Sequence, residues 1–327
     1  MLSLRRGTVS AITERHEGLV RLEVDGRPCV AYPPLTGPVG LGDEVIVNAQ
    51  ALDLELGSGG FDVLHANLTR GLDLPAEPGA HVMKLPYTPL QFAEVHAEEE
   101  TELPELLDGM PVVATSLHSQ LAPACAALHG VRVAYIQLAG GALPVALSDA
   151  VRALKERQLV EFTIGAGACF GGDADCVNVY SALAVARARG AEVAVCGIGP
   201  GIVGTSTGLG QGGMAAAEAI NAALGLGATP VLSLRISERE ARERHRGVSH
   251  HSEAVLSLQG VSYRVAWPRG CPVEHAIAEG AEEIDVAGWR DACEGLPLSH
   301  MGRGPDEDPW FFAAAFAAGR LASGLVA

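Results

Sequence analysis

Hydrophobic and polar residues alternate along the first part of the chain, in short runs separated by turns. Residues 19–24 alternate between apolar and polar from Val20 onward, Asp25-Gly26 is a two-residue hairpin signal, and a second run returns directly after it. A further turn leads into a short apolar run at 44–48. Short strands joined by tight turns predict a small β-barrel of the SH3-like or OB type over residues 1–70.

The pattern changes after a connector at residues 71–110. From residue 111, short apolar runs alternate with segments of helical periodicity, as in a parallel sheet that is buried on both faces. The predicted strands lie at 111–115, 131–136, 159–164, 192–196 and 229–234. This alternation predicts a doubly wound, mostly parallel Rossmann-like α/β domain over residues 111–327, with a half-exposed strand at 261–267 and a final helix that begins at Asp308-Pro309. Right-handed crossovers place the carboxyl ends of the five strands on one side of the sheet.

Charge narrows the classes of partner. The net charge is −16, and an acidic chain repels the phosphate backbone of nucleic acids. The barrel lacks a basic face and has few aromatic residues for stacking bases, so we expect a structural or partner-docking module. We therefore predict no nucleic-acid binding. Exposed edges of the barrel and the sheet are compatible with a homodimer, although no sequence feature determines one.

The cysteine content and the apolar segments favour the cytoplasm. Seven cysteines occur without a CxxC pair, which indicates reduced thiols rather than a disulfide framework or a zinc finger. The first residues lack the apolar stretch of a signal peptide, and no apolar run is long enough to span a membrane. We predict a cytoplasmic protein without membrane contact.

Ligands of doubly wound sheets bind beyond the carboxyl ends of the strands, so the loop after each strand is a candidate site. His118 and Ser119 follow the first strand at a helix N-terminus, where free N–H groups favour an anion. A simple capping role for Ser119 is the alternative. Gly140 and Gly141 follow the second strand, either as a tight turn or as a place where a ligand approaches the backbone.

The loop after the third strand is rich in glycine and acidic residues. Gly171 and Gly172 permit the close approach of a ligand, whereas Asp173 and Asp175 are candidates for capping the next helix. Since both aspartates cannot cap one helix, we expect one of them to be available to a ligand, a metal or acid–base chemistry. Asn178 is a further candidate contact.

The loop after the fourth strand, residues 199–213, matches the pattern GxGxxG. In a dinucleotide-binding fold the helix begins within this motif, but here glycines continue to Gly213 and the next strand ends in Arg235 rather than in an acidic residue. We therefore interpret the segment as a loop that wraps a phosphate or carboxylate. The candidate contacts are Gly199, Gly201, Gly204, Thr205 and Thr207.

The segment after the fifth strand, residues 235–251, holds the densest set of candidate groups. Its arginines suit phosphate and carboxylate, which arginine binds bidentately. A solvated helix between Ser237 and Gly247 explains the alternation of Arg and Glu but leaves the histidines unexplained. The candidate anion contacts are Arg235 and, in the glycine-rich tail, Arg303. The candidate acid–base residues are His245, His250 and His251, together with His118 after the first strand.

A divalent metal is a further candidate. If the third and fifth strands converge, Asp173 and Asp175 could meet the three histidines, and oxygen with imidazole ligands suits Zn, Mn or Fe. Adjacent residues on a helix point about 100° apart, so we expect His250 and His251 not to be ligands together.

Six motifs occur in order along the chain. They are Asn67-Leu-Thr-Arg70, His81-Val-Met-Lys-Leu-Pro-Tyr-Thr-Pro-Leu-Gln91, Phe170-Gly-Gly-Asp173, Gly199-Pro-Gly-Ile-Val-Gly-Thr205, Arg244-His-Arg-Gly-Val-Ser-His-His251 and Met301-Gly-Arg-Gly304. In this combination the chain resembles a bacterial family catalogued as domain of unknown function 3866. The resemblance covers nearly the whole chain and implies no activity.

The sequence thus predicts that a small anionic molecule, phosphorylated or carboxylated, binds at glycine-rich loops beyond the strand ends. Two classes of function stay open. An enzyme would use a histidine as acid or base. A non-catalytic metabolite sensor or scaffold would only bind, which fits the absence of a Walker lysine, a nucleophile elbow and an HExxH motif from the sequence.

Overall fold

The computed structural model describes residues 2–55, 59–258 and 262–326. The chain divides into two compact units, 1–95 and 96–327, and each unit has a hydrophobic core of its own. The division falls inside the stretch 71–110, which the sequence suggests as a connector.

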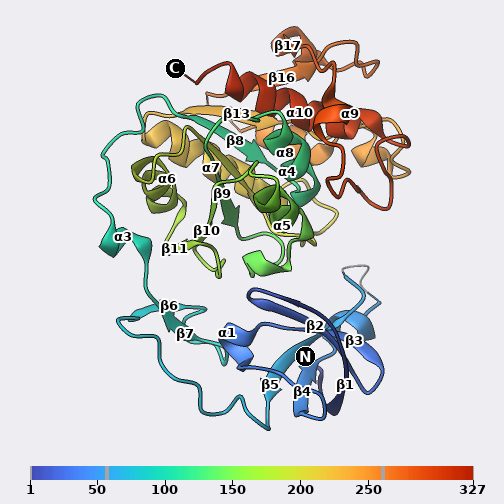
Figure 1. Cartoon of the computed structure of the whole chain (residues 1–327). Coiled ribbons are helices and arrows are strands. Elements are labelled where there is room, and N and C mark those ends of the chain that lie inside the picture. Colours follow the sequence, from blue (N-terminus) through green and yellow to red (C-terminus); the bar gives the residue numbers. More distant parts are fainter. Residues whose placement is uncertain (1, 56–58, 259–261, 327) are drawn as a thin grey trace. The chain divides into compact units, whose positions relative to one another are not determined.

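The first unit is a closed barrel of five strands in the order β1-β2-β3-β5-β4, which confirms the predicted barrel (Figure 1). Its strands are β1 (Leu4–His16), β2 (Leu19–Val24), β3 (Arg27–Ala31), β4 (Glu44–Asn48) and β5 (Asp62–Asn67). The remaining elements are α1 (Pro33–Thr36), α2 (Gln50–Asp53) and a hairpin of β6 (Val82–Lys84) with β7 (Phe92–Glu94). Alternate residues of β2 fill the interior, as the sequence pattern predicts: Leu22 and Val24 are buried.

A buried carboxylate joins two turns of the barrel. Asp43, which is 1% exposed, accepts hydrogen bonds from Asn67 Nδ2 at 2.8 Å and from Arg70 Nε at 2.9 Å. It also accepts one from the backbone N–H of Gly40 at 2.8 Å. Burial raises the pKa of Asp43, but the hydrogen bonds outweigh it and leave the pKa below its usual value. The motif that begins at Asn67 therefore has a structural role.

The second unit is built on an eight-stranded, all-parallel sheet in the order β11-β10-β9-β12-β8-β13-β16-β17. The strands are β8 (Pro111–Thr115), β9 (Val133–Leu138), β10 (Phe162–Ala166), β11 (Ala174–Cys176), β12 (Val193–Ile198), β13 (Thr229–Ser233), β16 (Arg264–Pro268) and β17 (Glu282–Ile284). The five predicted strands are all present, with ends shifted by a few residues, and their carboxyl ends lie on one side of the sheet. The strand expected at 261–267 is β16, although residue 261 lies outside the described residues.

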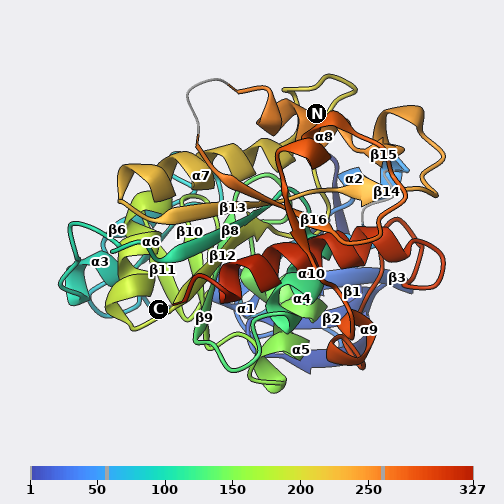
Figure 2. The same cartoon turned by 90° about the horizontal axis from the view of Figure 1, so that it is seen from above.

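Helices cover both faces of the sheet, which confirms the doubly wound α/β fold (Figure 2). One face packs against α3 (Ala97–Glu100), α6 (Val179–Ala188), α7 (Ala215–Gly225) and α8 (His250–Leu256). The other packs against α4 (Leu121–Ala126), α5 (Asp149–Glu156), α9 (Trp289–Ala292) and α10 (Pro309–Ser323). Along β8 the side chains alternate, with Val112 and Ala114 in the first core and Val113 in the second.

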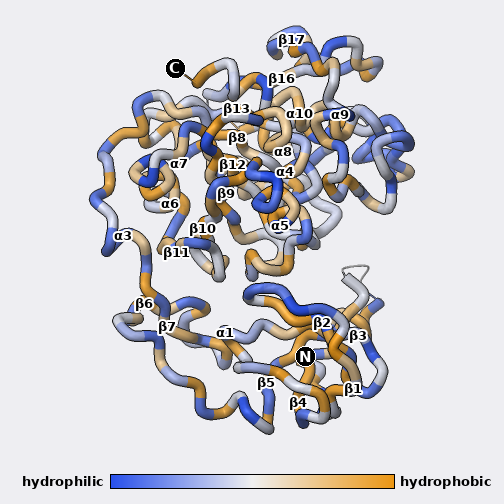
Figure 3. The backbone as a smooth tube through the Cα atoms, in the orientation of Figure 1, coloured by the Kyte–Doolittle hydropathy of each residue, from blue (hydrophilic) through white to orange (hydrophobic). Residues whose placement is uncertain are grey.

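The strand order departs from the usual 3-2-1-4-5-6 arrangement, because β12 lies between β9 and β8. Figure 3 shows the hydrophobic residues of this unit gathered in its central strands and in α10. None of the helices among the described residues is long and apolar enough to cross a membrane.

The segment between Ser237 and Gly247 is not the predicted helix. β14 (Ile236–Ser237) and β15 (Gly247–Val248) pair as antiparallel strands, and a single 3-10 turn, Glu243–His245, lies between them. The N–H of Glu240 does donate to Ser237 Oγ at 3.1 Å, as in a capping box. The Glu240 side chain, however, is directed into a buried group of arginines and does not return to the backbone as a cap requires.

Candidate functional site

The glycine-rich loops after β9 and β12 contact each other through their backbones. The N–H of Val203 donates to the carbonyl of Gly140 at 2.9 Å. A Cβ atom at Gly141 would lie 2.2 Å from the carbonyl oxygen of Gly199, and one at Gly140 would lie 2.5 Å from that of Gly212. These glycines are required for the packing of two loops against each other, so their clustering needs no ligand to explain it.

The hydroxyl groups predicted to wrap an anion bond within their own loop. Thr205 Oγ1 and Thr207 Oγ1 lie 2.8 Å apart, and Thr205 Oγ1 also donates to the carbonyl of Gly210 at 3.0 Å. Gly201 and Gly204 lie in the same exposed segment. The two hydroxyls therefore stabilise a surface turn.

The acidic residues after β10 are engaged by their neighbours. Asp173 binds Lys155 Nζ at 2.6 Å, and its Oδ2 accepts from the N–H of Thr163 at 2.8 Å. Burial raises the pKa of Asp173, but the bonds from Lys155 and Thr163 outweigh it and lower the pKa overall. Asp175 accepts from the N–H of Gly171 at 2.9 Å. Asp173 thus forms a structural ion pair.

Asn178 is the N-cap of α6. Its side chain accepts from the N–H groups of Tyr180 at 2.9 Å and Ser181 at 3.1 Å. The expectation that Asp173 or Asp175 caps this helix is therefore wrong, because Asp173 precedes the short strand β11 and Asp175 lies within it. Gly172 is also explained by packing, since a Cβ atom there would lie 2.7 Å from the carbonyl oxygen of Ala174.

The strand order separates this loop from the histidines. Three strands lie between β10 and β13, so the two are four spacings apart, about 19 Å at about 4.8 Å per spacing. Asp173 and Asp175 follow β10, whereas His245, His250 and His251 follow β13. The strand order therefore keeps these two loops too far apart to bind one metal ion together.

His118 links three elements of the fold. Its Nδ1 lies 3.0 Å from the carbonyl oxygen of Ile198, and its Nε2 lies 2.7 Å from Ser148 Oγ. A carbonyl can only accept, so Nδ1 donates and Nε2 accepts from the serine hydroxyl. Burial lowers the pKa of His118 to about 4. Both ring nitrogens are thus occupied by the protein itself.

Arg235, directly after β13, is the centre of a buried polar network. Its side chain is 2% exposed; Nη1 lies 3.2 Å from His251 Nδ1, and Nη2 lies 3.4 Å from both Glu240 Oε2 and His300 Nε2. Its Nε has no hydrogen-bond partner among the described residues. Burial lowers the pKa of Arg235 to about 10, which leaves it protonated at neutral pH.

The network carries more positive than negative charge. Glu240 binds Arg242 Nε at 3.0 Å and Arg303 Nη2 at 3.0 Å, and Arg303 Nε also binds Asp308 Oδ2 at 3.2 Å. Burial raises the pKa of Glu240, but the bonds from Arg242 and Arg303 hold it well below its usual range. With Arg235, three guanidinium groups meet two carboxylates, so the sum is +1.

His300 belongs to this network, and sequence reasoning did not select it. Its side chain is buried and stacks on Phe311, with ring centroids 3.8 Å apart. Its Nδ1 lies 3.3 Å from Ser119 Oγ, which connects the loop after β8 to Arg235. Burial, followed by Arg235, lowers the pKa of His300 to about 3. The only sequence signal was its place three residues before Arg303, directly before the motif Met301-Gly-Arg-Gly304.

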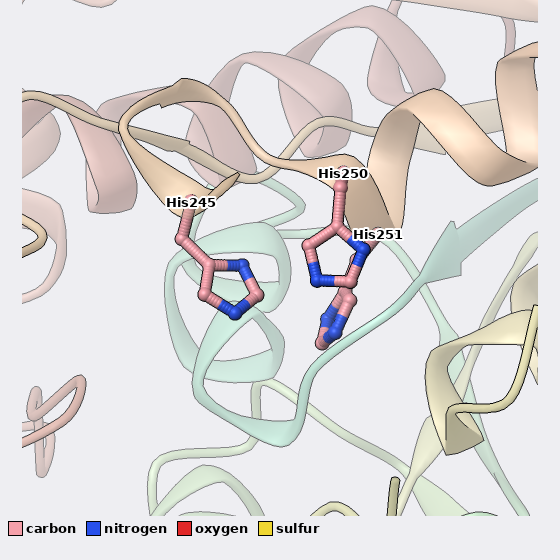
Figure 4. A group of neighbouring side chains, drawn as sticks. All are labelled: His245, His250 and His251. Atoms are coloured by element: carbon pink, nitrogen blue, oxygen red, sulfur yellow. The ribbon is translucent and has the colours of Figure 1, made fainter. Parts of the chain in front are cut away.

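The three histidines after β13 lie together (Figure 4). His245 ends the 3-10 turn, and His250 and His251 begin α8. Ring centroids are 4.5 Å apart for His245 and His250, 4.8 Å for His245 and His251, and 4.5 Å for His250 and His251. The expectation that the side chains of His250 and His251 point apart is wrong. Helical side chains tilt toward the N-terminus of their helix, and because these two residues begin α8, no preceding helical turn separates their rings.

The imidazole rings of His245, His250 and His251 are neutral at neutral pH. Burial, followed by Arg235, lowers the pKa of His245 and of His251 to about 3. Burial, followed by Arg244, also lowers the pKa of His250. General acid–base catalysis is most efficient with a pKa near the working pH. The protein without ligand therefore holds imidazoles suited to accepting hydrogen bonds or binding a metal, rather than to transferring protons at neutral pH.

The predicted residues thus fall into two sets. The structure brings Ser119, Arg235, His245, His250, His251 and Arg303 into one neighbourhood, and joins Glu240, His300 and Asp308 to them. The other candidates serve loop packing, a helix cap or local ion pairs.

Comparison with known proteins identifies the family. No curated protein and no solved structure matches the chain. The model of one family, described as "Protein of unknown function (DUF3866)", matches residues 28–319. Since this match spans most of the sequence, the chain belongs to the DUF3866 family.

Proposed function

We propose that the protein binds a small anionic molecule, phosphorylated or carboxylated, at the arginine–histidine network that follows β13. The observation that carries this proposal is Arg235, which is buried in a network of net positive charge and has an unpartnered Nε. Uncompensated buried charge is costly, so a native fold retains it where a ligand supplies the missing charge. The proposed site therefore lies in the segment after β13 rather than in the glycine-rich loops.

The unpartnered atoms define what the ligand must offer. Arg235 Nε needs an acceptor, and a phosphate or carboxylate oxygen forms a strong, charge-assisted bond with it. Asp308 Oδ1 and His250 Nε2 are also buried without a partner among the described residues. A ligand with both acceptor oxygens and a donor group, such as a hydrogen phosphate or a hydroxy acid, satisfies more of these atoms than an anion that only accepts.

A thermal-shift experiment tests this proposal on the full chain after exhaustive dialysis. The probes are inorganic phosphate, citrate and a nucleoside monophosphate, each at a series of concentrations. A ligand at 100 times its Kd adds about 2.7 kcal/mol, which raises the Tm by about 5 °C or more. The proposal fails if the folded, ligand-free protein shows no shift with any probe.

Two variants locate the bound anion. Arg235→Gln removes the central charge while Glu240 keeps Arg242 and Arg303, so we expect a folded protein that loses the shift. Arg239→Gln is the matched control, because Arg239 is an exposed arginine of the same segment. Equal shifts in both variants would place the anion elsewhere.

Turnover is tested with the anion that binds best. Mass spectrometry of that anion after incubation with the protein distinguishes an enzyme from a sensor. An unchanged mass supports binding alone, and a new product that depends on Arg235 identifies an enzyme.

A further inference from the structure

The three histidines form a compact group, and the proposed anion does not explain why three imidazole rings gather in one place. One ligand atom from each of His245, His250 and His251 lies within 4.8 Å of the others, and Figure 4 shows the three rings gathered in one place. They come from two elements, the 3-10 turn Glu243–His245 and the first turn of α8. The hairpin formed by β14 and β15 is what brings the two elements together.

The nitrogen atoms of this group are only partly satisfied. His250 Nε2 is buried and has no hydrogen-bond partner among the described residues. His245 Nδ1 bonds to Ser249 Oγ at 2.7 Å, whereas its Nε2 has only a long contact of 3.4 Å from Arg244. A hydrogen bond at one ring nitrogen that orients the other is the usual support of a metal-binding histidine. A buried ring nitrogen without a partner destabilises the fold, and a metal ion bound between the three rings would remove this cost.

We infer that His245, His250 and His251 together bind one divalent metal ion of the zinc class. Imidazole suits Zn²⁺ and Fe²⁺, whereas Mg²⁺ and Ca²⁺ prefer oxygen ligands, and the described residues of the group include no carboxylate. Three histidines that leave further positions open are the ligand set of a reactive ion rather than of a closed structural site.

The neighbourhood of Arg235 connects this ion to an anion. Three neutral imidazoles leave the charge of the ion uncompensated, so an oxygen anion is favoured at the open position. A guanidinium can only donate, so His251 Nδ1 accepts from Arg235 Nη1 in the ion-free protein. A metal ion bound at His251 Nδ1 would occupy this lone pair, so Arg235 Nη1 would become free to donate a hydrogen bond to the anion. This link rests on the proposed function, whereas the metal site itself does not.

Zinc titration of the full chain, purified without a histidine tag and stripped with a chelator, tests the site. We expect about one Zn²⁺ per chain by elemental analysis after dialysis, a Tm that rises with Zn²⁺ alone, and visible absorption bands on Co²⁺ loading. His250→Ala should reduce retained zinc to near zero and should still fold, because its Nε2 makes no hydrogen bond among the described residues. His245→Ala is the second variant and should lose zinc as well.

The control is His129→Ala, which replaces an exposed histidine of the same unit and should retain one zinc ion per chain. Zinc content far below one per chain that neither Zn²⁺ nor Fe²⁺ restores would overturn the inference. Equal zinc retention in His250→Ala and in the control would do the same. Phosphate binding is measured on the metal-free protein in parallel, so that the loss of one proposal leaves the other to stand on its own result.

Discussion

Two regions at the same end of the sheet are both candidate anion sites by sequence but differ in structure. The loops after β9 and β12 carry clustered glycines and hydroxyls, and these groups are accounted for by contacts between and within the loops. The segment after β13 buries an arginine and gathers three histidines, and two of its buried side-chain atoms, Arg235 Nε and His250 Nε2, have no partner among the described residues. Clustered glycine alone is thus a weak indicator of a ligand, whereas a buried, unsatisfied charge is a strong one.

The largest expected effect comes from a substitution in the glycine-rich loops. Gly141→Ala would place a Cβ atom 2.2 Å from the carbonyl oxygen of Gly199, where neither backbone can yield without moving a strand end. We expect a loss on the order of 3 kcal/mol in the free energy of unfolding, measured by urea denaturation. Gly208→Ala is the control, since nothing lies within 4 Å of its Cβ position. Equal stability of both variants would show that the two loops are not packed as described.

A second prediction concerns His118, whose two ring nitrogens, unlike His250 Nε2, both have hydrogen-bond partners in the protein. The pKa of His118 is about 4 in the folded protein against 6.5 for a free side chain. The unfolded chain therefore takes up the proton first as the pH falls, and the stabilisation present above pH 6.5 is lost progressively toward pH 4. This residue should account for roughly 2 kcal/mol of the stability lost between about pH 7 and pH 5.

The measurement is the free energy of unfolding of the wild type and His118→Gln at both pH values. Glutamine does not titrate, so the variant should be less stable at neutral pH but should lose about 2 kcal/mol less on acidification. His129→Gln, at an exposed position, should follow the wild type. Parallel pH curves for His118→Gln and the wild type would show that His118 is not held neutral by burial.

The smallest effect is expected in the loop that the sequence suggested would wrap an anion. Thr205→Val and Thr207→Val remove hydrogen bonds within an exposed turn, so each should cost about 1 kcal/mol or less. Phosphate affinity, measured by calorimetry, should stay within about twofold of the wild type, because neither hydroxyl belongs to the Arg235 network. A tenfold loss of affinity would move the anion site to this loop and reverse the comparison.

Local periodicity determined much of the fold. The alternating run of β2 and the continuous apolar runs of β8 and β12 were recognisable because burial on one or both faces of a strand leaves a direct pattern in the sequence. Parallel crossovers then placed the loops after the strands on one side. Arg235 and the three histidines were identified because such groups are unusual after a buried strand.

Tertiary structure alone decided which of these loops share a site. The insertion of β12 between β9 and β8, and the distance between β10 and β13, depend on how both faces of the whole sheet pack, which no local pattern encodes. His300 joins Arg235 from a distant tail because its ring stacks on Phe311 of α10. His250 and His251 converge because they occupy the first turn of a helix. The sequence identified the candidate side chains, but whether each of their polar atoms finds a hydrogen-bond partner depends on residues that only folding brings together.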